Sequence, residues 1–397
     1  MPTGCRLPPG AVEPAATGLE TDGTSLGTIE AESNMLYIYG PQADLWRRGG
    51  SLPGVIIGFG FIAQGHLRGY RDGSDLSVNA VVDLCSQRRR IAEERFGLRA
   101  YPDTASLFET EQPEFLDICS PPNTHPAYIA EALERKVPAL CEKPVFLPGD
   151  TPYWDVVADI IDSGPVVYPC ANYKFAPVFE HVRQRIESGY VGDVNSVRVR
   201  ILRRGHARGV TEWHPDWRRD SRVSAGGILR DHGPHAIYLA TSLTGLVPTS
   251  VSCIAGTMAS DAFPESEDTV LLRVRCNGDA EIEVCLSWAS AYRDSYYVIS
   301  GSRNSVAVHN DELIFARDGR TSREGVVSQF DDPSHSAWFA AMFADFASLL
   351  NDPAAAAARL PALLGEAALC SDVIEAGYAS AAQGGEWVPL AQPAPTW

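Results

Sequence analysis

The stretch GGILRDHGPHAIYLATSLTG (residues 226–245) carries acid/base side chains inside an otherwise apolar helical sequence. Asp231 and His235 are four residues apart and therefore share one face of a helix. A histidine exchanges protons near neutral pH without any perturbation, so the pair predicts an acid/base site facing a cleft. The alternative is a hydrogen-bonded buried pair with no chemical role. Pro234 fits either a helix start or a kink.

His232 adds a second imidazole beside Asp231 and completes a D-H-x-x-H pattern. Such a pattern is compatible with zinc. Because no Cys or Glu stands at ligand spacing, we expect no metal and treat His232 as a candidate substrate contact.

The stretch SLPGVIIGFGFIAQGHLRGY (51–70) contains a G-x-G-x-x-A pattern between an apolar run and a helical sequence. Gly58 permits a tight turn, Gly60 permits close approach of a pyrophosphate, and Ala63 permits close packing of helix on strand. The phosphates are expected at the helix N-terminus. The candidate cofactor contacts in this turn are Gly58, Phe59, Gly60, Phe61 and Ile62.

A second apolar strand, SVNAVVD (77–83), ends in Asp83, about 20 residues after these glycines. An acid there accepts hydrogen bonds from a ribose 2′-hydroxyl and repels a 2′-phosphate, which favours NAD over NADP. Arg88, Arg89 and Arg90 follow closely. They either hold a 2′-phosphate, which keeps NADP possible, or form the solvated start of the next helix.

Two further buried strands, in FLDICSPPNTHP (115–126) and VPALCEKPV (137–145), each run into a polar loop. Ligands of parallel sheets bind at the carboxyl ends of the strands. His125 is either a structural cap or part of the active-site wall. The candidate cofactor contacts in these loops are Ser120, Pro121, Asn123, His125, Glu142 and Lys143.

Strands that alternate with helices predict a doubly wound parallel α/β sheet in a nucleotide-binding domain over residues 51–170. Residues 171–390 instead predict a mixed, largely antiparallel α+β sheet, since CNGD (276–279) is a strong hairpin signal. Its strands are expected near 194–204, 248–258, 268–276, 280–288, 295–300 and 305–309, and its helices near 177–188, 226–245, 335–350 and 363–381. Residues 1–50 are expected to be disordered, since they lack a continuous apolar pattern.

Other candidate substrate contacts lie in TEWHPDWRRD (211–220) and at the end of a strand near Tyr173. The aromatic face of Trp217 suits the C–H face of a sugar ring, and Arg218 suits a carboxylate or phosphate. Simple loop packing explains these residues equally well.

The composition of the chain excludes several partners. With 33 Lys and Arg against 50 Asp and Glu, the net charge is −17, which disfavours nucleic acid and anionic membranes. The nine scattered cysteines form no C-x-x-C pair and indicate a reduced, cytoplasmic protein. No apolar run approaches the roughly 20 residues of a membrane span.

Taken in order, GFGFIA, VVD (81–83), CSPPNTH (119–125), CEKP (141–144) and GGILRDHGPH (226–235) resemble the glucose–fructose oxidoreductase / inositol dehydrogenase / MocA (Gfo/Idh/MocA) family. The resemblance covers about residues 52–390. It implies a Rossmann domain followed by a mixed-sheet domain whose flat face often supports homo-oligomers, dimers or tetramers.

The resemblance also implies NAD(P)-dependent hydride transfer to or from a sugar, cyclitol or related polyol, with Lys143, Asp231 and His235 as the catalytic set. We expect His235 to act as acid/base, Lys143 as polariser and relay partner, and Asp231 as the residue that orients His235. Two alternatives remain open: a glycosidase that uses NAD without net redox, and a ligand-sensing regulator on the same fold.

Overall fold

The computed structural model describes residues 51–390, except residues 74, 150, 260–262 and 328–335. The chain divides into two units, Met1–Ile38 and Tyr39–Trp397, and every described residue belongs to the second. The disorder expected for residues 1–50 therefore lies outside the described part of the chain.

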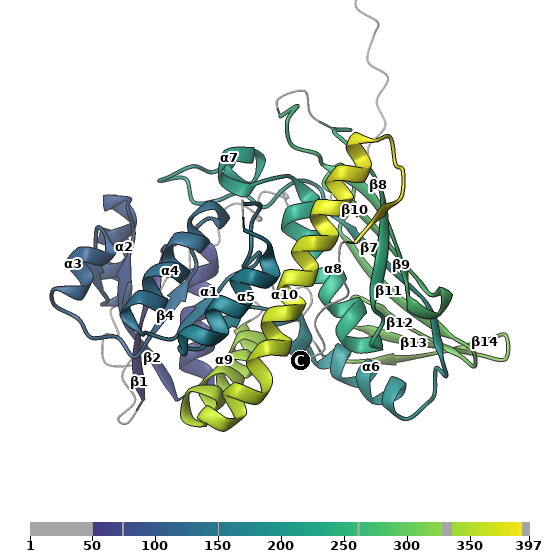
Figure 1. The fold of residues 1–397 in the computed structure, drawn as a ribbon, viewed down its shortest axis with the longest axis horizontal. Coiled ribbons are helices and arrows are strands. Elements are labelled where there is room, and N and C mark those ends of the chain that lie inside the picture. Colours follow the sequence, from purple (N-terminus) through teal and green to yellow (C-terminus); the bar gives the residue numbers. More distant parts are fainter. Residues whose placement is uncertain (1–50, 74, 150, 260–262, 328–335, 391–397) are drawn as a thin grey trace, which may run out of the picture. The chain divides into compact units, whose positions relative to one another are not determined.

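The first sheet is parallel throughout, with the strand order β3-β2-β1-β4-β5-β6. Its central strand β1 is buried over its last four residues, because helices cover both faces (Figure 1). The strands are β1 (Leu52–Ile57), β2 (Leu76–Val82), β3 (Arg99–Tyr101), β4 (Phe115–Ile118), β5 (Ala139–Cys141) and β6 (Val167–Pro169). The helices that accompany them are α1 (Phe61–Gly73), α2 (Ser86–Phe96), α3 (Thr104–Phe108), α4 (His125–Arg135) and α5 (Tyr153–Ser163).

The second sheet is mixed, with the order β14-β13-β12-β11-β7-β10-β9-β8-β15. Only β7 and β10 pair in parallel among these described strands, and the remaining neighbours are antiparallel. The strands are β7 (Val194–Leu202), β8 (Pro248–Gly256), β9 (Thr269–Cys276), β10 (Glu281–Ser287), β11 (Asp294–Gly301), β12 (Ser305–His309), β13 (Glu312–Arg317), β14 (Arg320–Gly325) and β15 (Val388–Pro389). The expected fold class, a parallel sheet followed by a mixed one, is confirmed.

The helices of the second half are α6 (Pro177–Glu187), α7 (Ser221–Ser224), α8 (Ile228–Thr244), α9 (Ser336–Asn351) and α10 (Pro353–Ala382). Helix α8 packs against the second sheet, while α10 contacts both α8 and α5 (Figure 1). Pro234 lies inside α8 and does not start it.

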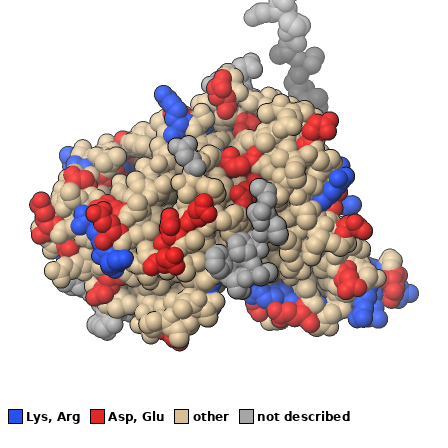
Figure 2. Space-filling model, viewed as in Figure 1, with Lys and Arg blue, Asp and Glu red and all other residues tan. Residues whose placement is uncertain are grey.

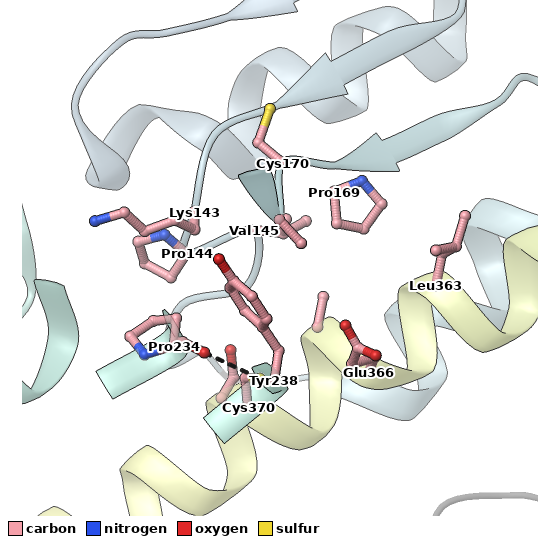
Figure 3. A pocket seen from close by; sticks show the side chains of 13 residues that line it. Lys143, Pro144, Val145, Pro169, Cys170, Pro234, Tyr238, Leu363, Glu366 and Cys370 are labelled. Atoms are coloured by element: carbon pink, nitrogen blue, oxygen red, sulfur yellow. Dashed lines mark hydrogen bonds between the residues drawn. The ribbon is translucent and has the colours of Figure 1, made fainter. Parts of the chain in front are cut away.

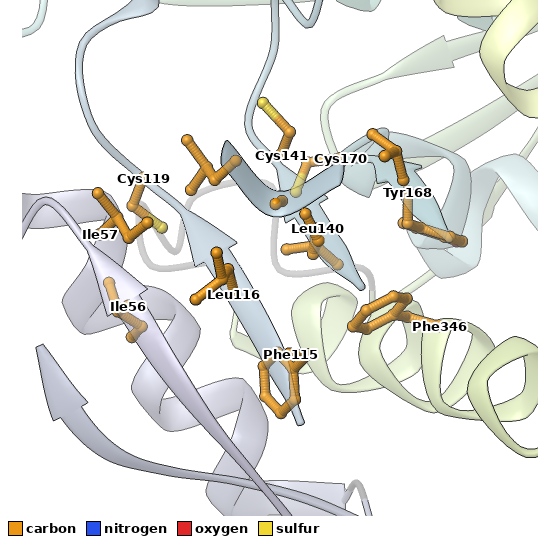
Figure 4. Packing of buried hydrophobic residues seen from close by; sticks show 14 of the residues in the cluster. Ile56, Ile57, Phe115, Leu116, Cys119, Leu140, Cys141, Tyr168, Cys170 and Phe346 are labelled. Carbon is orange, nitrogen blue, oxygen red and sulfur yellow. The ribbon is translucent and has the colours of Figure 1, made fainter. Parts of the chain in front are cut away.

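Helix α9 packs on the first sheet's helices although it follows the second sheet in the chain. The ring of Phe343 stacks on Tyr70 of α1 with centroids 3.9 Å apart. Phe346 lies beside Phe115 and Tyr168 in the core under the parallel strands (Figure 4). The core of the first sheet is therefore completed by residues more than 160 positions beyond its last strand. The domain boundary expected near residue 170 stays a prediction.

Candidate active site

The glycine-rich turn follows β1 as expected, and the two glycines serve different purposes. Gly58 has φ of +88°, and a Cβ there would lie 2.7 Å from Ser120 Cα, so the backbone and the neighbouring loop both require glycine. A Cβ on Gly60 would meet no described atom within 4 Å. Packing against the described atoms does not require glycine here, and the pyrophosphate contact expected at Gly60 stays a prediction. Phe61, 55% exposed, opens α1 next to this space.

Asp83 stands at the end of β2 and is held by backbone amides. Its Oδ2 accepts from Phe59 N at 2.7 Å, and its Oδ1 accepts from Cys85 N at 2.8 Å. These bonds tie the carboxylate to the glycine-rich turn, which is where a ribose acid belongs in such folds.

The three arginines behind Asp83 lie in the first turns of α2 and differ in their surroundings. Arg88 is buried and donates through Nε and Nη2 to Phe59 O at 2.8 and 2.6 Å, so its expected place in a solvated helix start is wrong. Arg89 donates to the carbonyl of Asp83 at 2.7 Å, and Arg90 is exposed. Arg88 and Arg89 therefore brace the backbone around the turn.

His125 joins two of the strand-end loops. Its ring nitrogens lie 2.8 Å from Pro144 O and 2.9 Å from Ser120 O, and the side chain is fully buried. Burial lowers its pKa. His125 thus fixes the loop that carries Lys143 against the loop after β4. In that second loop Asn123 donates to Arg222 O at 3.2 Å, in α7.

Glu142 connects the Lys143 segment to a buried charge network. Its Oε2 accepts from Lys143 N at 3.1 Å, and its Oε1 lies 3.3 Å from His66 Nε2. The other nitrogen of His66 lies 2.8 Å from Asp117 Oδ2, which also accepts from Tyr70 at 2.9 Å. Burial alone would lower the pKa of His66, but the two carboxylates outweigh it and raise this pKa to about 9.

Lys143 and Asp231 are in contact although Lys143 belongs to the first sheet's domain and Asp231 lies on a helix that packs against the second sheet. Lys143 follows β5, and Asp231 lies in the first turn of α8. Lys143 Nζ donates to Asp231 Oδ1 at 2.8 Å and to Asp231 O at 2.7 Å. Burial would raise the pKa of the Asp231 carboxyl, but Lys143 and Arg218 hold it well below its usual range.

The start of α8 explains the glycine pair before Asp231. A Cβ on Gly227 would lie 2.1 Å from Glu267 O, so only glycine fits. The Glu267 carboxylate accepts from Gly227 N at 2.9 Å and from Leu229 N at 3.0 Å, which caps the helix with a residue distant in sequence. This cap fixes the turn that presents Asp231.

His235 is oriented by a residue that the sequence analysis did not single out. Its Nδ1 lies 2.8 Å from the hydroxyl of Tyr238, which also accepts from Tyr173 N at 3.2 Å. The Tyr173 and His235 rings lie 4.3 Å apart. Tyr238 therefore contacts Nδ1 of His235 while Asp231 pairs with Lys143, and the expectation that Asp231 orients His235 stays a prediction.

The remaining substrate candidates surround Asp231. Arg218 Nε lies 3.5 Å from Asp231 Oδ2, with its guanidinium 4.2 Å from the centre of the Trp217 ring. His232 Nδ1 lies 3.2 Å from the same carboxylate oxygen. Burial lowers the pKa of His232. The structure thus brings Tyr173, Trp217, Arg218 and His232 to the region around Lys143, Asp231 and His235.

A pocket lies next to the Lys143–Pro144 segment, between α8 and α10. Figure 3 shows Tyr238 directing its hydroxyl toward this segment, while Glu366 and Cys370 reach in from α10. Glu366 accepts from Lys174 at 3.0 Å. Tyr238 therefore stands between the pocket and His235.

Metal-binding potential lies elsewhere in the described part of the chain. Two groups of three side chains are close enough to share an ion: His66, Asp117 and Cys119, and His66, Glu142 and Cys170. Neither includes Asp231, His232 or His235. Both nitrogens of His66 already contact carboxylates, so hydrogen bonds satisfy this network without an ion.

No helix among the described residues is both long and apolar enough to cross a membrane. On the face in Figure 2 the described acidic and basic side chains are interspersed and form no continuous basic surface. The lack of a continuous basic surface on this face agrees with the net charge of −17.

Comparison with known proteins finds a matching family model for each half of the chain. Residues 54–153 match the model of the oxidoreductase family with an NAD-binding Rossmann fold, and residues 179–307 match the GFO/IDH/MocA C-terminal domain. D-apiose dehydrogenase of Paraburkholderia graminis is 29% identical over 221 residues, which cover 55% of this chain and 56% of the relative. Inositol 2-dehydrogenase of Acidothermus cellulolyticus is 26% identical over 282 residues, covering 69% and 78%.

Solved structures share the fold. An inositol dehydrogenase homologue from Azotobacter vinelandii, complexed with NAD⁺, has a TM-score of 0.73 at 20% identity, covering 86% of this chain and 98% of that one. A levoglucosan dehydrogenase complexed with NADH has a TM-score of 0.70 at 19% identity, covering 86% and 100%. The chain spans about half the length of the first curated relatives it matches, with shares of 56%, 41% and 53%.

Proposed function

Because the chain belongs to the Gfo/Idh/MocA family of NAD-binding oxidoreductases, we propose that it transfers hydride between NAD and a secondary alcohol or ketone of a sugar, cyclitol or sugar derivative. The observation that carries this proposal is the Lys143–Asp231 ion pair, which joins the end of β5 to the start of α8. The matched relatives include D-apiose and inositol dehydrogenases, and none that we compared favours the glycosidase or regulator alternatives.

The residues around the glycine-rich turn fit NAD. The open space at Gly60 leaves room for the pyrophosphate, and the Asp83 carboxylate suits the ribose hydroxyls. NAD is favoured over NADP because the Asp83 carboxylate would repel a 2′-phosphate and because Arg88 and Arg89 already donate to backbone carbonyls. When bound, the nicotinamide supplies the hydride acceptor or donor.

The side chains of the protein would then transfer the proton and stabilise the charge that develops on the substrate oxygen. His235, whose Nδ1 lies 2.8 Å from the Tyr238 hydroxyl, would exchange a proton with the substrate hydroxyl. The ammonium group of Lys143 would polarise the substrate oxygen. Asp231 would hold that ammonium in place.

The cofactor assignment is tested by titrating the protein with NADH and with NADPH while following nicotinamide fluorescence. We expect tighter binding of NADH. Tighter binding of NADPH would show that the protein prefers NADP and binds its 2′-phosphate. Binding of neither nucleotide would overturn the oxidoreductase proposal.

The catalytic assignment predicts that Lys143→Met and His235→Ala each lower kcat by about 10²–10⁴-fold while NADH affinity stays within about threefold. His181→Ala, which removes an exposed histidine, serves as the control. Near-complete turnover in both site variants would show that neither residue takes part in proton transfer.

We also propose a cytoplasmic homo-oligomer, a dimer or tetramer, that forms through the second sheet. Ile254 and Leu271 are paired on neighbouring strands of that sheet and are 61% and 40% exposed. Light scattering on the purified chain gives the subunit number, and a monomer at micromolar concentration would contradict the proposal.

A further inference from the structure

The loop that leads from β7 into α7 places a second cation against Asp231. Arg218 Nε lies 3.5 Å from Asp231 Oδ2, and Nη1 donates to Ala207 O at 3.1 Å. The guanidinium also stacks over Trp217, whose ring centre is 4.2 Å away. These contacts hold Arg218 in one orientation beside the carboxylate to which Lys143 is bound.

Arg218 retains unused hydrogen-bonding capacity in this position. Its Nε is buried and has no hydrogen-bond partner among the described residues, because the 3.5 Å approach to Asp231 does not form a hydrogen bond. The side chain as a whole is 22% exposed. A ligand that enters beside Asp231 would therefore meet the exposed part of a guanidinium whose orientation is already fixed by Ala207 and Trp217.

Two cationic side chains contact the same carboxylate. Within the described part of the chain, Asp231 is the one carboxylate within 4.0 Å of either Lys143 Nζ or the Arg218 guanidinium. Asp231 therefore divides its charge between Lys143 and Arg218, while Glu142 contacts the backbone amide of Lys143.

A third cation, Arg203, lies close enough to His232 to lower its pKa in addition to the effect of burial. Arg203 is 8% exposed and is held by the carbonyls of Leu202 and Asp294 and by the Ser295 hydroxyl, with no carboxylate partner in the described structure. Burial lowers the pKa of Arg203 first, and the nearby charge of Arg293 lowers it further. Buried cations that no carboxylate neutralises favour a negatively charged ligand.

We propose that the substrate carries a carboxylate, as in a sugar acid or a related polyhydroxy acid, and that Arg218 binds this group. The inference rests on the proposed hydride transfer and narrows its substrate class. A carboxylate can accept charge-assisted hydrogen bonds from the guanidinium of Arg218. A neutral sugar hydroxyl can accept a hydrogen bond there but lacks the attraction between opposite charges. The hydroxyl to be oxidised would then lie between Lys143 and His235.

The test compares matched neutral and acidic substrates with the full chain and NAD⁺: D-glucose with D-glucuronate, and D-galactose with D-galacturonate. NADH formation gives kcat/KM, and titration of each compound into the protein–NADH complex gives binding. Arg218→Gln is compared with Arg204→Gln, which removes the same charge from an exposed position on the same loop.

We expect kcat/KM for the better acid to exceed that for its neutral counterpart by at least about 10-fold. Arg218→Gln should reduce this preference by about 10–100-fold, mainly through KM, while Arg204→Gln leaves it unchanged.

The alternative outcomes separate the two proposals. Equal or better turnover of the neutral sugars, with no effect of Arg218→Gln on the acid-to-neutral ratio, would overturn the carboxylate proposal and leave the oxidoreductase proposal standing. Arg218-dependent binding of an acid without turnover would support the anion site and count against hydride transfer. Absence of both binding and turnover for every compound would overturn the carboxylate proposal.

Discussion

At the scale of single residues, the site is a set of polar groups that restrain one another. Asp231 contacts Lys143 and Arg218, and His235 contacts Tyr238. Each proposed catalytic side chain therefore has a partner that fixes its orientation before the substrate arrives. Preorganisation of this kind predicts that the partners matter for turnover as well as the reacting groups.

Tyr238 is the partner whose role is most easily isolated. Tyr238→Phe removes the hydroxyl that lies 2.8 Å from His235 Nδ1 and keeps the ring volume. We expect kcat to fall by roughly 10-fold and the shape of its pH dependence to change, because this hydroxyl determines which nitrogen carries the proton. NADH affinity should be unchanged.

Tyr297→Phe is the matched control, since Tyr297 is 4% exposed and its buried hydroxyl has no hydrogen-bond partner among the described groups. Wild-type kcat and pH dependence in Tyr238→Phe would show that the tyrosine only fills space.

The sequence predicted part of this site from spacing and part only from resemblance. The four-residue spacing placed Asp231 and His235 on one helix, but no local rule links Lys143 to Asp231 across 88 residues. Tyr238 is three residues after His235 and shares its helix face, so a signal was present. A tyrosine in an apolar helix is typical of a core residue, which is why it was missed.

At the scale of elements, the contact between α1 and α9 depends on a missing side chain. A Cβ on Gly69 of α1 would lie 2.7 Å from Phe339 Cβ and 2.8 Å from the Phe343 ring. The helices can approach this closely because glycine leaves room for both aromatic residues.

Gly69→Ala is expected to lower the free energy of unfolding by about 1–3 kcal/mol, since the added methyl group must separate two packed helices. Gly73→Ala on the same helix is the control, because its nearest neighbour is Ala340 Cβ at 3.9 Å. Urea unfolding followed by circular dichroism gives both values. Equal effects of the two substitutions would show that close packing at Gly69 is not limiting.

The edge strand β14, which the sequence did not predict, has no apolar residues. β14 is exposed along its whole length, so it shows no alternation that predicts a half-buried strand. Its position follows from the turn that precedes it, where Asp318 and Gly319 have φ of 51° and 71°. Asp-Gly is a hairpin signal, and this one was available in the sequence.

At the scale of the whole molecule, the buried network of His66, Asp117 and Glu142 links stability to pH. The pKa of His66 is raised from 6.5 to about 9, so the folded chain binds this proton more tightly than the unfolded chain does. The resulting stabilisation is complete below pH 6.5 and is lost as the pH rises through about 9.

The free energy of unfolding should therefore decrease by up to about 3 kcal/mol between pH 6.5 and 9.5. Buried thiols such as Cys119 do not oppose this trend, because burial raises their pKa well above its usual value. Urea unfolding at a series of pH values measures the slope. A flat or rising stability over this interval would mean that His66 is not protonated in the folded protein.

The contribution of α9 and α10 to the first core has a consequence for biosynthesis. Phe343, Phe346 and Leu364 fill the space beside strands that are all complete by residue 169. Until these three residues emerge from the ribosome, the nascent Rossmann sheet exposes the apolar surface that they later cover. The parallel sheet is therefore translated early but completed late, and the growing chain exposes aggregation-prone surface during that interval.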